Sequence, residues 1–343
     1  MNTKISIDDL FERIQLVKKI NAEQPLFPSY EKYFDRKINT MSSVSKLNRK
    51  LLAWDTILRY HGIDLENKKV LVVGCGAGWE CVYMYAMGAK EVVGLEVMEM
   101  FVKGMEKMFP ILGLHPTVKP ILQDIHTYSL DSYYDLILTV DAISHMYDHK
   151  LFLSSCFKLL APNGSLLIID DNNALNYRRR KEVANIWESW EKYGLDLKSN
   201  DGKTMHINSY EQDRYEYIVE RFPELSKEAK SLAERTANFN RQQIDNAILK
   251  YKKTGIMPNS VYRRGVMAYD SKYDMPKEKQ FNPYTLAHEI RSARFENAIH
   301  LPDLITTDTF FRKNVVKMLI VFKPFSYFFV SKGFSVSGRK SSH

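Results

Sequence analysis

The feature that most constrains the fold is a short apolar run that ends in glycines, Val70-Leu71-Val72-Val73-Gly74-Cys75-Gly76-Ala77-Gly78. A continuous run of branched apolar residues is typical of a parallel strand that is buried on both faces. Glycines allow a sharp turn and the close approach of a ligand, because no Cβ stands in the way. Twenty residues after Gly76, Glu96 ends the next apolar run, where a carboxylate can accept hydrogen bonds from both hydroxyls of a ribose. These features predict a nucleoside site at the end of a buried strand.

Strand-like and helix-like segments alternate around this motif. The alternation predicts an α/β fold, a mostly parallel sheet with helices on both faces. The expected strands are Val70–Val73, Glu91–Glu96, Asp135–Val140 and Ser165–Asp170, and the expected helices are Glu80–Met87, Val97–Met108 and Leu151–Leu160, with a turn at Ala161–Gly164.

The alternation stops after Asp171, and about a hundred residues rich in Lys, Arg, Glu, Tyr and Asn follow. Such an interruption of a sheet domain is typical of a lid or substrate platform. We expect four parts: a helical cap (1–60), a nucleoside-binding core (61–173), a helical insertion or lid (174–280) and the C-terminal part of the core (281–343). The expected elements outside the core are helices at Ile5–Ile20, Val44–Tyr60, Tyr177–Tyr193, Tyr210–Phe222, Ser226–Tyr251 and Pro283–Ala293, and strands at Phe295–His300 and Phe334–Gly338.

The glycine spacing separates two classes of nucleoside cofactor. A dinucleotide fingerprint would place its third glycine at position 79, where this chain has Trp79. The spacing Gly74-x-Gly76-x-Gly78 instead resembles motif I of class I S-adenosylmethionine-dependent methyltransferases. Three further segments resemble that family in order: Gln123-Asp124-Ile125, Asp135 to Asp141 (motif IV), and Leu159 to Ile168, which is similar to the passage before strand five.

The resemblance implies a Rossmann-like class I methyltransferase fold, whose seven-stranded sheet is mostly parallel with an antiparallel last strand. It implies S-adenosylmethionine as cofactor and S-adenosylhomocysteine as product. The positions that match the family's cofactor-binding residues are Gly74, Cys75, Gly76, Gly78, Glu96, Val97, Asp124, Ile125 and Asp141. Trp79 is expected either at the mouth of the glycine turn or in a structural role within the helix that follows.

Two residues after the fourth strand are candidate catalytic groups. Asp141 and His145 are expected to face the methyl group, and His145 is a candidate general base because an imidazole titrates near neutrality. A histidine that packs on the following helix is the alternative. Asp141 and Asp171-Asn172 also resemble the cation ligands of some O-methyltransferases, and oxygen ligands suit Mg²⁺. The metal-free reading is favoured, and the use of a metal stays open.

The acceptor is expected to be a polar small molecule. No Asp-Pro-Pro-Tyr or Asn-Pro-Pro-Tyr follows strand four, so a nucleic-acid amino group is not favoured. The insertion is rich in tyrosine and arginine, including the run Arg178 to Lys181, a composition that suits a polar or anionic ligand or simply a solvated surface. The C-terminal ending resembles small-molecule and saccharide methyltransferases, which favours a sugar or glycoconjugate hydroxyl. An RNA or protein methyltransferase and a non-catalytic cofactor-binding protein are the alternatives.

Composition and charge bear on location and partners. Three cysteines among 343 residues and no basic, apolar leader at residues 1–10 favour a cytoplasmic protein. The apolar stretch Val315 to Val330 is interrupted by Lys317, Lys323 and Pro324, so a transmembrane span is not expected. Of the net charge of +8, residues 301–343 carry +5, from seven basic and two acidic residues. This tail fits an anionic substrate or a peripheral membrane contact. The sequence does not indicate an oligomeric state.

Overall fold

The computed structural model describes residues 4–28, 30–129, 133–198, 204–272, 274–303 and 320–342. The chain forms two compact units. The core unit comprises Met1–Ile143, Asp148–Asp171 and Asn282–His343, and the inserted unit comprises Ser144–Tyr147 and Asn172–Phe281. Residues 4–60 are part of the core unit. The lid role expected for residues 174–280 stays a prediction.

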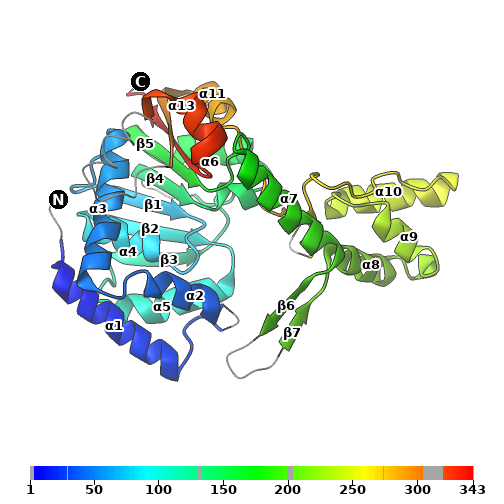
Figure 1. The fold of residues 1–343 in the computed structure, drawn as a ribbon, viewed down its shortest axis with the longest axis horizontal. Coiled ribbons are helices and arrows are strands. Elements are labelled where there is room, and N and C mark those ends of the chain that lie inside the picture. The colour runs from blue at the N-terminus through cyan, green and yellow to red at the C-terminus, as the bar shows by residue number, and fades with distance from the viewer. Residues whose placement is uncertain are drawn as a thin grey trace. The chain divides into compact units, whose positions relative to one another are not determined.

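The core unit contains a seven-stranded sheet in the order β10-β11-β5-β4-β1-β2-β3. The strands from β3 to β5 run parallel, and β11 is antiparallel to both β5 and β10, as the sequence predicted for the last strand. Figure 1 shows these strands as one twisted layer. The bounds are β1 Lys69–Val73, β2 Glu91–Glu96, β3 Val118–Leu122, β4 Tyr134–Val140, β5 Leu160–Asp170, β10 Phe295–Pro302 and β11 Phe334–Lys340. The predicted fold class is confirmed.

The central strand β1 has the burial that its apolar run predicts. Val70 and Leu71 are fully buried, and Val72 pairs with Gly94 of β2 on one side and Leu138 of β4 on the other. The edge strand β3 has no such run, because Pro120 interrupts it. Proline lacks an N–H and is tolerated at a sheet edge, which explains why the pattern did not predict this strand.

Helices pack against the sheet, and the N-terminal helix α1 packs against two other helices. In the core unit, α4 contacts β1 and β2, α5 contacts β2 and β3, α6 contacts β5, and α11 contacts β10 and β11. Helix α1 begins after the Ser6 cap and buries Leu10, Ile14 and Val17 at helical spacing, and it contacts α3 and α5. The bounds are α1 Ile7–Glu23, α2 Glu31–Asn39, α3 Val44–Tyr60, α4 Trp79–Ala86, α5 Glu99–Ile111, η1 Ile143–His145, α6 His149–Leu159, α11 Pro283–Ser292, α13 Lys323–Phe325 and η3 Ser326–Val330.

The expected turn at Ala161–Gly164 lies within β5. The pairing of β5 with β4 shifts between Tyr134 and Leu136, so the residues of the turn form an irregularity in a longer strand. Asn163 has a φ of 63°, a left-handed conformation that asparagine tolerates better than most residues. The sequence predicted an irregular backbone at these residues, but it did not predict that the strand continues through them.

The inserted unit is mainly helical. Its elements are α7 Tyr177–Lys192, β6 Leu195–Lys198, β7 Thr204–Ile207, α8 Tyr210–Arg221, η2 Pro223–Leu225, α9 Ala229–Glu234, α10 Arg241–Thr254, β8 Tyr269–Asp270 and β9 Met275–Pro276. The single helix expected at Ser226–Tyr251 is wrong, because two helices, α9 and α10, occupy that range. Asn238 has a φ of 67°, and Asn240 starts α10 with a capping box to Gln243. The antiparallel pair of β6 and β7 was not predicted.

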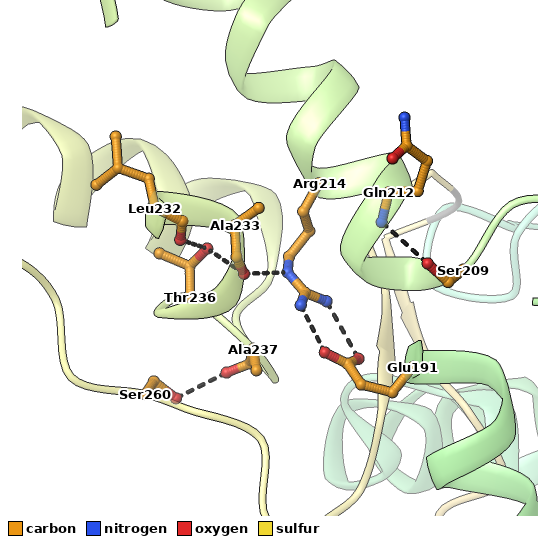
Figure 2. A network of polar contacts seen from close by, with 9 residues as sticks. All are labelled: Glu191, Ser209, Gln212, Arg214, Leu232, Ala233, Thr236, Ala237 and Ser260. Carbon is orange, nitrogen blue, oxygen red and sulfur yellow. Dashed lines mark hydrogen bonds and ion pairs between the residues drawn. The ribbon is translucent and has the colours of Figure 1, made fainter. Parts of the chain in front are cut away.

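A buried ion pair joins three helices of the inserted unit (Figure 2). The two Nη atoms of Arg214 lie 3.2 and 2.5 Å from the carboxylate oxygens of Glu191, and its Nε donates to the carbonyl of Ala233 at 3.0 Å. Arg214 and Glu191 are 0% and 1% exposed. Arg214 is therefore a structural residue that ties α7, α8 and α9 together, although it belongs to the arginine-rich insertion whose composition suited a polar or anionic ligand.

None of the helices in the described part of the chain has the length and hydropathy that a bilayer span requires.

Candidate active site

The glycine turn between β1 and α4 has the backbone that only glycine adopts readily. Gly74, Gly76 and Gly78 have φ values of 65°, 51° and 81°. A Cβ on Gly74 would lie 2.6 Å from the Cβ of Ala142, and one on Gly78 would lie 2.7 Å from the Sδ of Met105. On Gly76 the nearest atom would be the hydroxyl of Tyr33 at 3.5 Å. The first and third glycines thus permit close packing, whereas the second leaves room above the backbone.

Glu96 holds this turn from the end of β2. Its Oε2 accepts a hydrogen bond from the amide of Gly76 at 2.8 Å, and its Oε1 accepts from the amides of Val97 and Met98 at 2.9 and 3.1 Å. The residue is 7% exposed. Oε1 already accepts two hydrogen bonds, whereas Oε2 accepts one and keeps a lone-pair direction for a ribose hydroxyl. The geometry fits a ribose held between the glycine turn and the end of β2.

The loop after β3 lies beside the backbone of Glu96. The amide of Gln123 donates to the carbonyl of Glu96 at 3.0 Å. Asp124 is exposed, and its Oδ1 accepts from the amide of His126 at 2.8 Å, while Ile125 is buried. Asp124 therefore has a carboxylate oxygen available at the same sheet edge as Glu96.

Cys75 and Val97 complete the predicted cofactor set, and they differ in environment. The Sγ of Cys75 lies 3.6 Å from the Sδ of Met105, and a hydrogen bond with Cys81 together with burial raises the pKa of the Cys75 thiol. The side chain of Val97 is 58% exposed at the sheet edge. Cys75 thus directs its side chain into the core, so that only its backbone is available to a ligand.

Asp141 follows β4 and stands next to the glycine turn through its neighbour Ala142. Its φ is 50°, its amide donates to the carbonyl of Ile169 at 2.9 Å, and its Oδ1 accepts from the amide of Asp171 at 3.2 Å. The residue is accessible to solvent. Although part of the residue is open to solvent, the protein packed around its carboxyl group partly desolvates it. This desolvation, followed by the charges of Asp171 and Asp170, raises the pKa of Asp141 to about 7. This carboxyl group can exchange a proton near neutrality.

His145 ends η1 and belongs to the inserted unit, whereas Asp141 belongs to the core unit. Within the inserted unit, burial and then the charge of Lys277 lower the pKa of His145, which Glu278 partly offsets. Its imidazole is therefore neutral at neutral pH and able to accept a proton. Both predicted catalytic groups are chemically capable of acting as a base, and their roles stay predictions.

Trp79 is a core residue. It is 1% exposed and stacks on Phe34 of α2, with ring centroids 5.7 Å apart. This contact holds α2 against the start of α4. It also explains how Tyr33, the residue before Phe34, comes to lie over Gly76.

Tyr33 is a site residue that the sequence analysis missed. Burial and then the charges of Glu80 and Asp141 raise the pKa of its hydroxyl, so this group stays protonated among acidic neighbours. It can donate a hydrogen bond to a ligand above Gly76. Nothing in the sequence distinguishes it from the other 19 of the chain's 20 tyrosines, because only the docking of α2 brings it to the turn.

The acidic residues that resemble cation ligands, Asp141 and Asp171, follow the ends of β4 and β5. The amide of Asp171 donates to the carboxylate of Asp141, and Asp170 is fully buried. Over the described residues, no group of three or more His, Cys, Asp or Glu side chains has an arrangement that could hold a metal ion.

Comparisons with known proteins identify the family to which the chain belongs. The methyltransferase domain family matches residues 45–222, which is more than half of the chain. The bovine mitochondrial ubiquinone biosynthesis O-methyltransferase is 26% identical over 151 residues, 38% of this chain and 39% of that protein. A tRNA U34 carboxymethyltransferase of Shewanella baltica is 30% identical over 144 residues, 39% of this chain and 42% of the relative. The matches thus span about two fifths of the length of these relatives.

Among solved structures, a methyltransferase from Mesorhizobium loti aligns with 84% of this chain and 98% of its own, at 14% identity and a TM-score of 0.44.

Proposed function

The chain belongs to the family of class I S-adenosylmethionine-dependent methyltransferases, and from that premise we propose that it methylates a hydroxyl of a sugar, a glycoconjugate or another polar small molecule. The observation that carries this proposal is the position of Asp141, which follows β4 and directly precedes Ala142, the residue that packs against Gly74 of the glycine turn; its pKa is raised to about 7. A hydroxyl acceptor must lose its proton when it is methylated, so it needs such a group.

S-adenosylmethionine, when bound, supplies an electrophilic methyl group on a sulfonium. The residues around the turn fit it: Glu96 would accept from a ribose hydroxyl, Gly76 would allow it to approach the backbone, and Asp124 would accept from its adenine amino group. Tyr33 would cover it from α2.

Bound S-adenosylmethionine would give up its methyl group to the acceptor oxygen and leave as S-adenosylhomocysteine. Asp141 would take the proton that the acceptor hydroxyl loses. An aligned acceptor and a positioned base would accelerate such a transfer. His145 is the alternative base, and Mg²⁺ bound by Asp141 and Asp171 is the alternative means of lowering the acceptor's pKa.

The inserted unit by itself contains charged and hydrogen-bonding groups, and their role in acceptor binding stays a proposal. That unit contains His145 and the buried Lys277, whose pKa burial lowers. It also contains Arg179, which donates to Asn172 at 2.8 Å and pairs with Glu278 at 3.4 Å. This mixture of charged and hydrogen-bonding groups suits a polar, hydroxyl-rich acceptor.

Replacing Glu96 tests the cofactor site. Glu96→Ala and Glu96→Gln are expected to weaken the binding of S-adenosylmethionine and S-adenosylhomocysteine about 10- to 100-fold, because each removes a charge-assisted hydrogen bond of about 1.5–3 kcal/mol. Isothermal titration calorimetry of the purified chain measures the change. Glu99→Gln is the matched control, since Glu99 is exposed three residues further on and pairs only with Lys103 in the described contacts. A folded wild-type protein that binds neither nucleotide would contradict the proposal.

Replacing Tyr33 tests the cover over the turn. Tyr33→Phe keeps the ring contacts and removes the hydroxyl, so cofactor affinity is expected to fall about 3- to 10-fold, the value of one neutral hydrogen bond. The same titration measures it. Tyr60→Phe, on the exposed side of α3, should leave the affinity unchanged. An unchanged affinity in Tyr33→Phe would mean that the hydroxyl does not touch the cofactor.

An RNA acceptor is the second candidate. The relatives named tRNA U34 carboxymethyltransferases and the basic C-terminal tail favour it. RNA binding by this chain would weaken linearly with the logarithm of salt concentration. Strong binding of that kind, together with methyl transfer to RNA, would replace the small-molecule proposal. Cofactor binding without turnover on any acceptor would instead indicate a non-catalytic binding protein.

A further inference from the structure

A short segment of the core unit between β10 and β11 presents an apolar surface to solvent. It includes α13 and the π-helical turn η3, and Figure 1 shows α13 beside α11. We call its exposed side chains the aromatic patch: Val321, Phe322, Phe325, Phe328, Phe329 and Val330, which are 42% to 75% exposed. Four phenylalanines that are open to water within eight residues are unusual for a surface, because scattered single apolar residues are the norm.

The opposite side of the segment is fixed to the core unit. Tyr327 is fully buried, its hydroxyl lies 3.0 Å from the Nδ1 of His300 in β10, and its ring centroid lies 5.6 Å from that of Tyr284 in α11. The amide of Ser331 donates to the carbonyl of the buried Ser326 at 2.8 Å. The segment therefore has a defined orientation, in which polar and hydrogen-bonded groups face inward and phenylalanines face outward. This is the reverse of an ordinary surface helix.

The charge of the segment that bears the aromatic patch indicates what kind of partner the patch would bind. Over the described residues 320–342 the sequence has four Lys or Arg and no Asp or Glu. A second copy of the chain would bring the same positive charge to the contact and repel it. An anionic lipid surface satisfies both properties, since it accepts phenylalanine side chains at the acyl boundary and attracts basic residues at the headgroups.

We propose that the aromatic patch docks the protein peripherally on an anionic lipid bilayer. The phenylalanines would enter the boundary between headgroups and acyl chains, and the basic tail would add electrostatic attraction. This inference is independent of the acceptor, and it needs no membrane-spanning helix.

Vesicle flotation of the full chain tests the proposal. The wild type is expected to float with vesicles of phosphatidylcholine mixed with phosphatidylglycerol, and to float less with phosphatidylcholine alone. Phe325→Ser/Phe329→Ser is expected to lower the partition coefficient about tenfold or more, because two apolar side chains no longer leave water. Leu16→Ser/Leu52→Ser is the matched control, since those leucines of α1 and α3 are 48% and 41% exposed.

Three results would overturn the proposal: no flotation of the wild type, an equal loss in the control variant, or a dimer that the patch variant converts to a monomer. The last result, from light scattering, would show that a second copy covers the patch. Titration with S-adenosylmethionine should be the same for the patch variant and the wild type, which separates a failure of this inference from a failure of the proposed function. Phe322→Ser/Phe328→Ser provides the same reading if the first variant does not fold.

Discussion

Asp141→Asn is expected to lower kcat for methyl transfer by about 10²- to 10⁴-fold, the usual contribution of a general base. Asparagine has nearly the same shape and keeps the oxygen that accepts from the amide of Asp171, so the loop after β4 should stay in place. The variant cannot take the acceptor's proton, which is the physical reason for the loss. Formation of S-adenosylhomocysteine with a panel of sugar and glycoconjugate acceptors measures it.

The pH dependence of the same reaction tests whether Asp141 is the base. The base must be deprotonated, and the pKa of Asp141 is raised to about 7. The rate should therefore rise with pH through about 7 and level off above it. His145→Gln is the comparison that distinguishes the two candidate bases. A larger loss in His145→Gln than in Asp141→Asn would assign the base to His145 and contradict the proposal for Asp141.

Arg214→Met and Glu191→Gln are each expected to destabilise the inserted unit by about 3–5 kcal/mol, because each leaves a charge or polar group buried without its partner. Both side chains are almost completely buried, and the pair joins α7, α8 and α9 (Figure 2). Denaturant unfolding, followed by tryptophan fluorescence and by proteolysis of the inserted unit, measures the loss.

The double variant Arg214→Met/Glu191→Leu should lose less stability than either single one, since it removes both charges together. Glu224→Gln is the control, because its pair with Lys252 is exposed and should matter little. Single variants as stable as the wild type would mean that the ion pair contributes nothing to the unit.

The parts of the fold that the sequence predicted are those whose signal is local. Strands β1, β2 and β4 and helix α3 lie within one residue of their predicted bounds, because buried parallel strands require continuous apolar runs and α3 has a Ser43 cap and regular spacing. The glycine turn could be predicted from the sequence, because a turn with positive φ values requires glycines and so leaves a local pattern of glycines. The match to the methyltransferase domain family confirms the resemblance drawn from it.

The parts that the sequence did not predict depend on contacts between distant segments. Helix α2 has nine residues and buries only Phe34 and Ile38, so its apolar pattern is too short to recognise. Its docking on Trp79 is what brings Tyr33 to the turn. The raised pKa of Asp141 likewise depends on Asp170 and Asp171, thirty residues further along the chain. Arg214 is a further example, because its charge is buried and paired with Glu191 and so is not available to a ligand.

The ends of the inserted unit are tied to each other. The amide of Phe281 donates to the carbonyl of Asn172 at 2.9 Å, and the amide of Ala174 donates to the carbonyl of Phe281 at 2.8 Å. The pairing of β5 with β11 must otherwise close a loop of more than 160 residues, from Asp170 to Phe334. Once the inserted unit has folded and its ends have met, the free chain between these two strands is shorter by about a hundred residues. Prior folding of the insertion thus offsets most of the sequence separation that it adds between the two strands, and β11 can reach β5 without a search over the full intervening sequence.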